Sequence, residues 1–513
     1  MADRRLQLGL AAAGLLLAAL DALAVVTLLP QMLEAVDLPI DHIEAAAPIL
    51  TGFLGGYVVA MPLLGAFSDA RGRLPAYAAA LTIFGLGSTL TAVAPALGWL
   101  VTGRVLQGLG GGALVPLSLA LAADLYPSGH RGLAIGAVSA VQEAGSVLGP
   151  VYGASLAAGL GTWRWVFWLN LPLGALILTG IWLSLRRGSS VLSARSGPGS
   201  GSGGRDVEWL GAVLLGLGLG LAVVALYPDD PGNRAINANA VPFGVAALLV
   251  LAAFGWRESR RLNPLVRHQL LRRRAFGGSM VTNLLTGGAL MVALVDVPIL
   301  ARGVFSQDTW HSGLLLTRFL VGVPIGALAG GWLASHVGQR TSAAVGLVLA
   351  AAAFVLMASW DLQELSGSGL TASIELGVCG LGFGLVIAPL STAVLDQARG
   401  TEHGLAASLV VLSRTVGMVV VLASLTSFGL ARLQTILGQR RCGTLTAGGG
   451  NLRDQLAAYE SCLRGALLQE YREIFLIAAA LCGLAAVIAV ATLPPRAPRL
   501  AIARSAPPAA VPE

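Results

Sequence analysis

Continuous apolar stretches, each long enough to cross a bilayer, dominate the pattern of hydrophobic and polar positions along the chain. About 20 helical residues span the ~30 Å hydrocarbon core of a membrane. Strands of a membrane barrel alternate in segments of ~10 residues instead, so this pattern predicts an all-α polytopic membrane protein. Fourteen spans are expected, at residues 8–29, 46–67, 76–95, 98–123, 132–158, 163–185, 208–227, 239–256, 276–300, 311–335, 341–360, 371–397, 404–431 and 473–494.

The composition excludes a soluble protein of this length. Of the 513 residues, 55% are apolar and only 12% are charged, about half of the ~25% found in soluble domains. So few charges cannot cover the surface of a soluble chain. The first apolar stretch carries Asp21 and lacks a small-residue cleavage site, so we expect a retained helix and not a signal peptide.

The basic residues set the expected orientation. All 33 residues counted as Lys or Arg are arginines, and the net charge is +7. They lie mostly in alternate loops, which places both chain ends in the cytoplasm by the positive-inside rule. The connection before the last span is an exception, because it carries six arginines. Since the arginines form no single basic face, we expect no nucleic-acid partner.

Two polar segments divide the chain. Residues 186–207 form a Gly/Ser-rich linker, and residues 257–274 form a basic amphipathic stretch that either contacts anionic lipid or anchors the inner face. The two spans between these segments look like an insertion between two six-span halves. The expected units are an N-terminal half at 1–185, linkers with two inserted helices at 186–274, a C-terminal half at 275–497 and a cytoplasmic tail at 498–513.

A repeated loop supports duplication of a six-helix unit. GAFSDARGRLP (Gly65–Pro75) follows the second span, and GGWLASHVGQR (330–340) follows the tenth, so each lies between the second and third spans of its half. Glycine permits close helix approach, and the charged residues face the cytoplasmic boundary. An ordinary positive-inside turn would not explain two copies in matching places. The residues singled out in the first copy are Gly65, Asp69, Arg71, Gly72 and Arg73.

Two further motifs lie inside spans. The fourth span, LVTGRVLQGLGGGALVP, places Arg104 within an apolar helix, and the fifth contains QEAGSVLGPVYGA. Together with ALDALAVVTLLP in the first span and TWRWVFWLNLPLG in the sixth, they resemble the major facilitator superfamily, in particular its fourteen-helix drug:proton antiporter branch. The glycines and proline of the fifth-span motif are Gly145, Gly149, Pro150 and Gly153.

This resemblance implies the major facilitator fold, with two six-helix halves and two inserted linker helices. The loop at 65–75 is similar to the cytoplasmic gating motif of the superfamily, Arg104 to its fourth-helix arginine, and residues 145–153 to its antiporter signature. In the second gating loop, Ser335 and His336 stand where an acid and a base are common. This departure weakens the expectation of a second charge relay.

Charged residues inside spans are candidates for function. Each costs at least ~2.5–3.5 kcal/mol on insertion scales. The candidates for proton coupling or the cavity are Asp21, Arg104, Glu143, Arg318, Arg414 and, nearer an external end, Asp296.

Asp21 and Arg104 lie in the first and fourth spans, which the resemblance places on the central cavity. An ion pair there is favourable when desolvated, and protonation of the aspartate would weaken it. The pair is therefore either a proton-coupled switch or a static bridge within the N-terminal half.

Glu143 and Arg414 occupy equivalent places in the fifth and thirteenth spans. Both are expected near the midplane of the membrane, with opposite charges. One hypothesis is an ion lock between the halves; the alternative is that each has a local partner, with Arg318 as the partner of Glu143.

The segment before the last span predicts a helical hairpin outside the membrane, at about 432–472. Leu456, Tyr459 and Leu463 follow helical spacing there, beyond a Gly-rich turn. Cys442 and Cys462 would lie on the oxidising side, where they form either a disulfide or free thiols.

Within the superfamily, the extended final helices, the positions of Glu143 and Arg414 and the absence of lysine resemble the mycobacterial triacylglyceride exporters that work with a periplasmic lipid-binding lipoprotein. That resemblance implies export of lipid from the bacterial inner membrane to the periplasm, with such a lipoprotein as partner. The apolar interior also suits the alternative function, a multidrug:proton antiporter for hydrophobic drugs.

Other function classes find no support in the sequence. We see no nucleophile elbow, no HExxH motif and no Cys/His spacing for a metal, so we do not expect an enzyme. A GxxxxGK[ST] phosphate loop is excluded because the chain has no lysine. We therefore expect no cofactor, and a proton gradient as the energy source.

Overall fold

The computed structural model describes the helical body of the chain. The described residues are 2–36, 47–186, 209–226, 237, 239–261, 264–265, 267–365, 369–440 and 452–495. Within them every regular element is a helix. Most of the Gly/Ser-rich linker, the turn that carries Cys442 and the tail from 496 lie outside the described residues.

Six long helices form the first half of the chain. They are α1 (Ala2–Glu34), α2 (Ala47–Arg71), α3 (Arg73–Ala92), α4 (Leu97–Leu125), α5 (Ser128–Leu160) and α6 (Arg164–Arg186).

The second half repeats this series after a short helix. It contains α10 (His268–Leu271), α11 (Arg274–Gly303), α12 (Thr309–Val337), α13 (Gln339–Met357), α14 (Leu370–Gln397), the 3₁₀ turn Gly400–Glu402, α15 (His403–Arg440) and α16 (Leu452–Thr492). Asp308 caps the start of α12, where its carboxylate accepts a hydrogen bond from the backbone N–H of His311 over 2.8 Å. This bond holds the pKa of Asp308 below its usual value.

Two inserted helices, α8 (Trp209–Leu226) and α9 (Ala240–Arg260), lie between the halves in sequence and at the edge of the bundle in space. Gly216 of α8 permits close approach to the backbone of Val59 in α2. Helix α9 packs on α8, and its outward side chains Val241 and Leu248 are 76% and 70% exposed. Such an apolar outer face fits contact with lipid chains.

Fourteen of these helices are long and apolar enough to cross a membrane, in agreement with the fourteen spans expected from the sequence. The prediction of an all-α polytopic membrane protein is confirmed. Some helices extend further than expected; α1, for example, runs from Ala2 to Glu34 and not only over 8–29. Apolarity marks the part of a helix inside the membrane, whereas backbone hydrogen bonding continues into polar ends.

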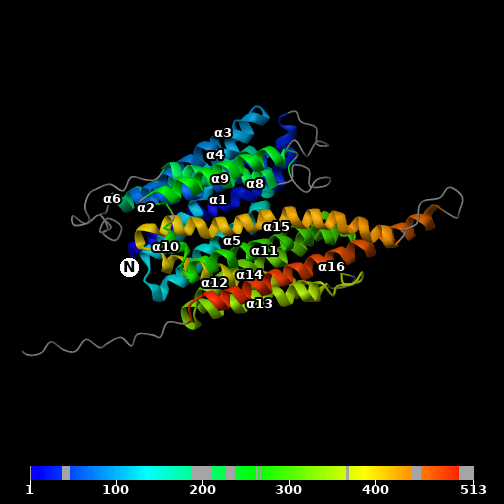
Figure 1. The fold of residues 1–513 in the computed structure, drawn as a ribbon. Helices are drawn as coiled ribbons and strands as arrows, with labels where there is room; N and C mark the ends of the chain where they lie inside the picture. The colour runs from blue at the N-terminus through cyan, green and yellow to red at the C-terminus, as the bar shows by residue number, and fades with distance from the viewer. Residues whose placement is uncertain are drawn as a thin grey trace, which may run out of the picture.

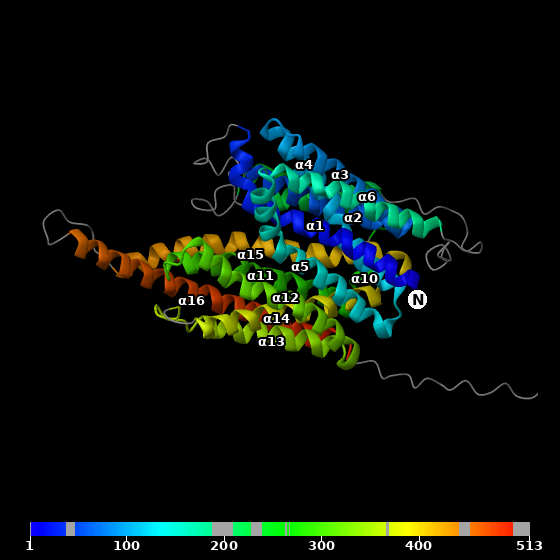
Figure 2. The same cartoon turned by 180° about the vertical axis from the view of Figure 1, so that it is seen from behind.

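The two groups of helices lie side by side along a common axis (Figures 1 and 2), with α5 packed against α12 of the second half and α15 against α2 and α4 of the first. Gly132 and Gly331 bring α5 and α12 together, while Gly65 and Gly404 bring α2 and α15 together. Both contacts lie at the end of the bundle that the arginine distribution assigns to the cytoplasm.

Helices α15 and α16 project beyond all others at the opposite end (Figures 1 and 2). They contain 38 and 41 residues, so they are roughly 57 and 62 Å long at 1.5 Å per residue, about twice the hydrocarbon core. At the base of the projection Arg432 binds Glu473 through two hydrogen bonds of 2.7 and 2.8 Å. The predicted helical extensions are present, while the turn that joins them lies outside the described residues.

Helices α11 and α15 approach closely at two glycines. A Cβ on Gly417 would overlap the carbonyl oxygen of Leu284, and a Cβ on Gly287 would overlap that of Arg414. This crossing fixes the position of Arg414 relative to the second half.

Gly417 and Gly483 provide a matched test of this packing, because nothing lies within 4 Å of a Cβ on Gly483. We expect Gly417→Ala to lower the free energy of unfolding by about 1–3 kcal/mol through overpacking. Gly483→Ala should be neutral or raise it by up to ~1 kcal/mol, because alanine is the better helix former. Thermal unfolding of the purified variants in detergent measures both. Equal melting temperatures for the two variants would contradict the close approach.

Candidate functional site

Asp21 lies in a fully buried hydrogen-bond network between α1, α4 and α6. Nη1 of Arg104 and Nε2 of Gln107 donate to Oδ2 of Asp21 over 2.9 and 3.0 Å. Nδ2 of Asn170 donates to Oδ1 over 2.7 Å. Asp21 and Arg104 are both 0% exposed. Three donors from two other helices therefore hold this carboxylate.

A second layer of contacts fixes the donors. Oγ of Ser88 in α3 accepts hydrogen bonds from Gln107 over 2.9 Å and from Asn170 over 3.2 Å. The guanidinium of Arg104 lies 4.2 Å from the ring centroid of Phe53, a cation–π contact. Sequence reasoning missed Gln107 and Asn170. The available signal was an amide side chain inside each of two apolar spans.

The structure brings Asp21 and Arg104 together, as the sequence predicts, but encloses them within the first half. Because neither side chain has exposed surface, the pair does not line an open central space in this conformation. A role for it in proton coupling stays a prediction.

Glu143 and Arg414 form an ion pair that joins the two halves. Nη1 of Arg414 in α15 donates to Oε1 of Glu143 in α5 over 3.1 Å. The two side chains are 12% and 15% exposed, so the pair is largely removed from solvent. An ion pair between helices of opposite halves stabilises the arrangement in which those helices meet.

Arg318 and Asp296 lie away from this ion pair. Nη1 of Arg318 donates to Oγ of Ser373 over 2.5 Å, between α12 and the start of α14. The alternative in which Arg318 binds Glu143 therefore does not occur in this conformation. Asp296 borders a small cavity between α11 and α15, beside Val421, Leu425 and Thr426 of α15, among others.

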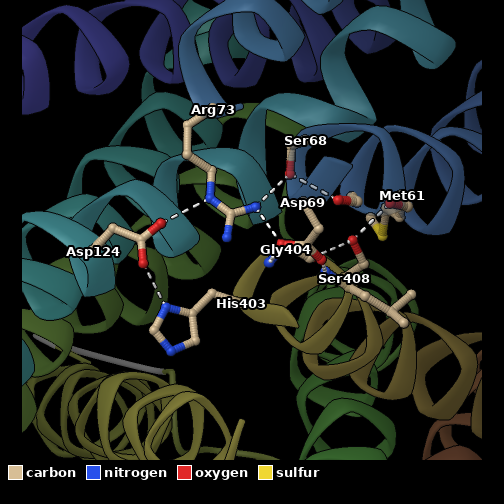
Figure 3. A network of polar contacts seen from close by, with 10 residues as sticks. Met61, Ser68, Asp69, Arg73, Asp124, His403, Gly404 and Ser408 are labelled. Atoms are coloured by element: carbon tan, nitrogen blue, oxygen red, sulfur yellow. Dashed lines mark hydrogen bonds and ion pairs between the residues drawn. The ribbon is translucent and has the colours of Figure 1, made fainter. Parts of the chain in front are cut away.

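The first gating loop forms a polar network that ties α2, α3 and α4 to the start of α15 (Figure 3). Arg73 donates to Asp69 over 2.5 Å and to Asp124 over 2.9 Å. The carboxylate of Asp69 in turn accepts hydrogen bonds from the backbone N–H groups of Gly404 and Leu405, each over 2.9 Å. A carboxylate at a helix N-terminus satisfies unpaired N–H groups and favours the helix dipole.

Two glycines make this contact between the halves possible. A Cβ on Gly65 would overlap Oγ of Ser408, and a Cβ on Gly404 would overlap Oγ of Ser68. Gly72 has φ +99°, a backbone conformation that favours glycine, which explains the sharp turn between α2 and α3. Arg71 is exposed, so of the two arginines predicted at this loop it is Arg73 that enters the network.

The second gating loop uses different charges from those examined in the sequence. Asp396 at the end of α14 accepts hydrogen bonds from Gln339 over 2.7 Å and from Arg131, at the start of α5, over 2.5 Å. Ser335 and His336 bond only locally, to Trp332 and to each other, among the contacts described. A second polar link between the halves exists, and sequence reasoning missed it.

The fifth-span motif packs α5 against α1. The glycines Gly145, Gly149 and Gly153 each permit close contact with α1, the last two with the backbone of Leu20 and Ala24. The carbonyl oxygen of Pro150 accepts a hydrogen bond from Thr27 over 3.2 Å. This motif thus brings Glu143, two residues before Gly145, close to the helix that carries Asp21.

The cysteines fall into two groups. Cys379 and Cys482 are free and buried inside α14 and α16. Cys462 lies in the projecting part of α16, whereas Cys442 lies outside the described residues. The pairing of Cys442 with Cys462 therefore stays a prediction.

The sequence of the chain is also similar to those of known proteins. Residues 11–422 match the sequence profile of the Major Facilitator Superfamily. The chain belongs to the Major Facilitator Superfamily. The superfamily is one of transporters, which confirms the expectation that this member is not an enzyme.

Several relatives within the superfamily are similar over almost the whole chain. A triacylglyceride transporter of Mycolicibacterium smegmatis is 37% identical over 496 residues, which cover 95% of this chain and 87% of the relative. A triacylglyceride transporter of Mycobacterium tuberculosis is 36% identical over 500 residues, covering 95% and 94%. A probable triacylglyceride transporter of Mycobacterium leprae is 36% identical, covering 95% and 96%.

Solved structures of the superfamily share the fold. A proton:xylose symporter matches with a TM-score of 0.60 at 14% identity, covering 96% of both chains. A human organic anion transporter matches with a TM-score of 0.57 at 19% identity, covering 93% of this chain and 99% of that one. These likenesses confirm the superfamily fold that the motifs indicated.

Removing one partner of the Asp21–Arg104 pair should leave a buried charge uncompensated. We expect Asp21→Asn and Arg104→Gln each to lower the free energy of unfolding by about 3–5 kcal/mol. The double variant should lose less than the sum, because two neutral side chains leave no unpaired charge. Thermal unfolding of the purified protein measures this, with Glu34→Gln at the exposed end of α1 as the control. Strictly additive losses would show that the two residues do not interact.

Proposed function

We propose that the chain is a proton-driven transporter that exports triacylglyceride-like lipids from the bacterial inner membrane to the periplasm. The observation that carries the proposal is sequence identity of 36–37% over 95% of the chain to transporters named for triacylglyceride. The projecting hairpin adds support, because a water-insoluble cargo needs an apolar path away from the membrane after it leaves the bundle.

Alternating access is the mechanism that this arrangement favours. Contacts between α2 and α15 and between α5 and α12 close the arginine-rich end, so the conformation would be outward-facing. Reaching the opposite state requires these contacts to separate. The Glu143–Arg414 pair lies between the moving halves and would act as an ion lock, which breaks when the glutamate binds a proton.

A proton gradient would supply the energy without a cofactor. The candidate carriers are carboxylates inside spans: Asp21, Glu143 and Asp296. Of these, Glu143 is the one that links a change in charge directly to contact between the halves. Asp21 would act through Arg104 inside the first half.

The hairpin of α15 and α16 would hand the lipid to a periplasmic lipid-binding lipoprotein. Leu456 and Tyr459 on its projecting part are 41% and 39% exposed, so apolar side chains remain available to a partner or a lipid chain. The Arg432–Glu473 bonds at its base keep the two helices together, which gives the partner a defined surface.

A multidrug:proton antiporter is the second candidate. The close packing of α5 on α1, through glycines of the motif that resembles the drug:proton antiporter signature, favours it. The two functions differ in their need for the hairpin, because a small hydrophobic drug enters water far more readily than a triacylglyceride and needs no carrier.

Purified protein in liposomes should accelerate transfer of labelled triacylglyceride to acceptor vesicles under an imposed pH difference. Deletion of residues 440–462 should reduce lipid transfer at least about tenfold and leave efflux of a hydrophobic dye intact, because only the lipid needs handover. Acceptor vesicles carrying a lipid-binding lipoprotein are the matched comparison. Dye efflux without any lipid transfer by the intact protein would favour the drug antiporter and sink the lipid proposal.

Charge reversal tests the ion lock. Glu143→Arg and Arg414→Glu should each reduce pH-driven lipid transfer more than about tenfold, since each places two like charges in contact. The double reversal should recover part of the lost rate because the pair is restored with its sense exchanged. Arg302→Gln, an exposed arginine of α11, is the control and should leave the rate unchanged. No recovery in the double variant would argue against the lock.

A further inference from the structure

The two polar links at the arginine-rich end are copies of one another. Asp124 ends α4 and Arg131 begins α5 seven residues later, followed by Gly-Leu-Ala; Asp396 ends α14 and His403 begins α15 seven residues later, again followed by Gly-Leu-Ala. In space the copies exchange partners. Asp124 binds His403 of the second half, and Asp396 binds Arg131 of the first (Figure 3 for the former).

The links differ in one chemical respect. Arg131 is a permanent cation, because a guanidinium does not deprotonate in proteins. His403 occupies the matching position with an imidazole, the side chain whose charge ordinarily changes between about pH 5 and 8. We call the Asp396–Arg131 contact the constant arm of the gate, because the charge of its cation does not change. We call the Asp124–His403 contact the titratable arm, because its imidazole can gain or lose a proton.

From this asymmetry we propose that His403 is a proton-binding site of the cytoplasmic gate. A proton taken from the cytoplasm would strengthen its contact with Asp124 and hold the gate closed, and opening the gate would release that proton to the cytoplasm. The ligand is a hydrogen ion, and its site consists of the His403 imidazole and the Asp124 carboxylate, with Arg73 as their positioning residue.

The geometry supports binding of a proton without rearrangement. Nδ1 of His403 lies 2.7 Å from Oδ1 of Asp124, while Nε of Arg73 donates to the other oxygen over 2.9 Å. Since a carboxylate only accepts hydrogen bonds, Nδ1 carries the hydrogen in both charge states. Protonation occurs at Nε2 and turns a hydrogen bond in which only the carboxylate is charged into an ion pair in which both partners are charged.

The surroundings of His403 are acidic on balance. Asp124 faces it from α4, and Asp69 binds the next two backbone N–H groups from α2. Arg73 of α3 is shared between these two carboxylates. Glu402, the preceding residue, is paired with Arg267 before α10 over 3.1 Å. Among the contacts of the described residues, three carboxylates near His403 are matched by two arginines, and a positive imidazolium would make the charges equal.

The direction of the pH effect follows by linkage. The closed gate binds the proton more tightly than the open gate, because only the closed gate holds Asp124 against His403. Closed molecules should therefore predominate at low cytoplasmic pH and decline as the pH rises through the range in which the imidazole loses its proton. Arg131 contributes no such change, since its charge is constant.

The test measures the gate and not the cargo, so its outcome is independent of the proposed lipid substrate. Spin labels are introduced at Arg186 of α6 and Thr341 of α13, both exposed at this end of the bundle. A genetically encoded ketone side chain attaches them, because the chain has cysteines of its own. Distance distributions of the purified full-length protein in nanodiscs, from pH 5 to 8.5, report the ratio of closed to open gates.

In the wild-type protein we expect the closed-to-open ratio to fall at least about fivefold over this range, the lower end of typical coupling between sites. His403→Gln keeps a hydrogen-bond donor without a titratable charge and should give a ratio that is low at every pH. His403→Arg copies the other arm and should give a high ratio at every pH. Asp396→Asn weakens the constant arm and should lower the ratio while its pH dependence stays.

The proposal would be overturned by an unchanged pH dependence in His403→Arg, or by a wild-type ratio that does not vary with pH. The second result needs no variant, so a folding defect in any of them does not affect it. Loss of pH dependence in Asp396→Asn would equally contradict the assignment, because it would place the titrating group in the other arm.

Discussion

A charge placed within the hydrocarbon core must find a partner, and this constraint organises the structure. For Asp21 and Arg414 the partner comes from a distant part of the sequence. Asp21 of α1 accepts hydrogen bonds from side chains of α4 and α6, and Arg414 of α15 donates one to a carboxylate of α5. Because an uncompensated charge in a low-dielectric interior costs several kcal/mol, each pair also fixes which helices are neighbours.

The pairs divide into two classes that do different work. Asp21 and Arg104 lie within one half, are fully buried and hold three helices as one body. Three pairs join opposite halves and are less completely buried: Glu143–Arg414, Asp124–His403 and Asp396–Arg131. Bonds of the first class would persist if the halves moved as bodies, whereas bonds of the second class would have to break. The relative energy of the two states of the transporter therefore depends mainly on the second class.

Sequence reasoning succeeded where the residues permit only one stable arrangement. Fourteen long apolar stretches are stable only as membrane-spanning helices. Asp21 has few candidate cations inside the first six spans, so its partner was also predictable. It failed where the partner is neutral or far away. Gln107 and Asn170 carry no charge that demands compensation, and the Asp396–Arg131 contact joins two helix ends that only the folded halves bring together. Ser335 and His336 stand where charged residues are common, which suggested that the second gating loop lacks a charge relay. The structure shows that residues outside this loop supply the charges.

Duplication explains both the resemblance and the difference between the two gate contacts. A pair of copied halves starts with identical arms, and each arm then changes without altering the other, because the contacts are separate in space. Replacing buried ion pairs by apolar residues is often neutral or stabilising, so stability alone poorly explains their presence where the two halves meet. It is better explained by switching, because a contact that depends on charge can be made and broken by one proton, whereas an apolar contact cannot.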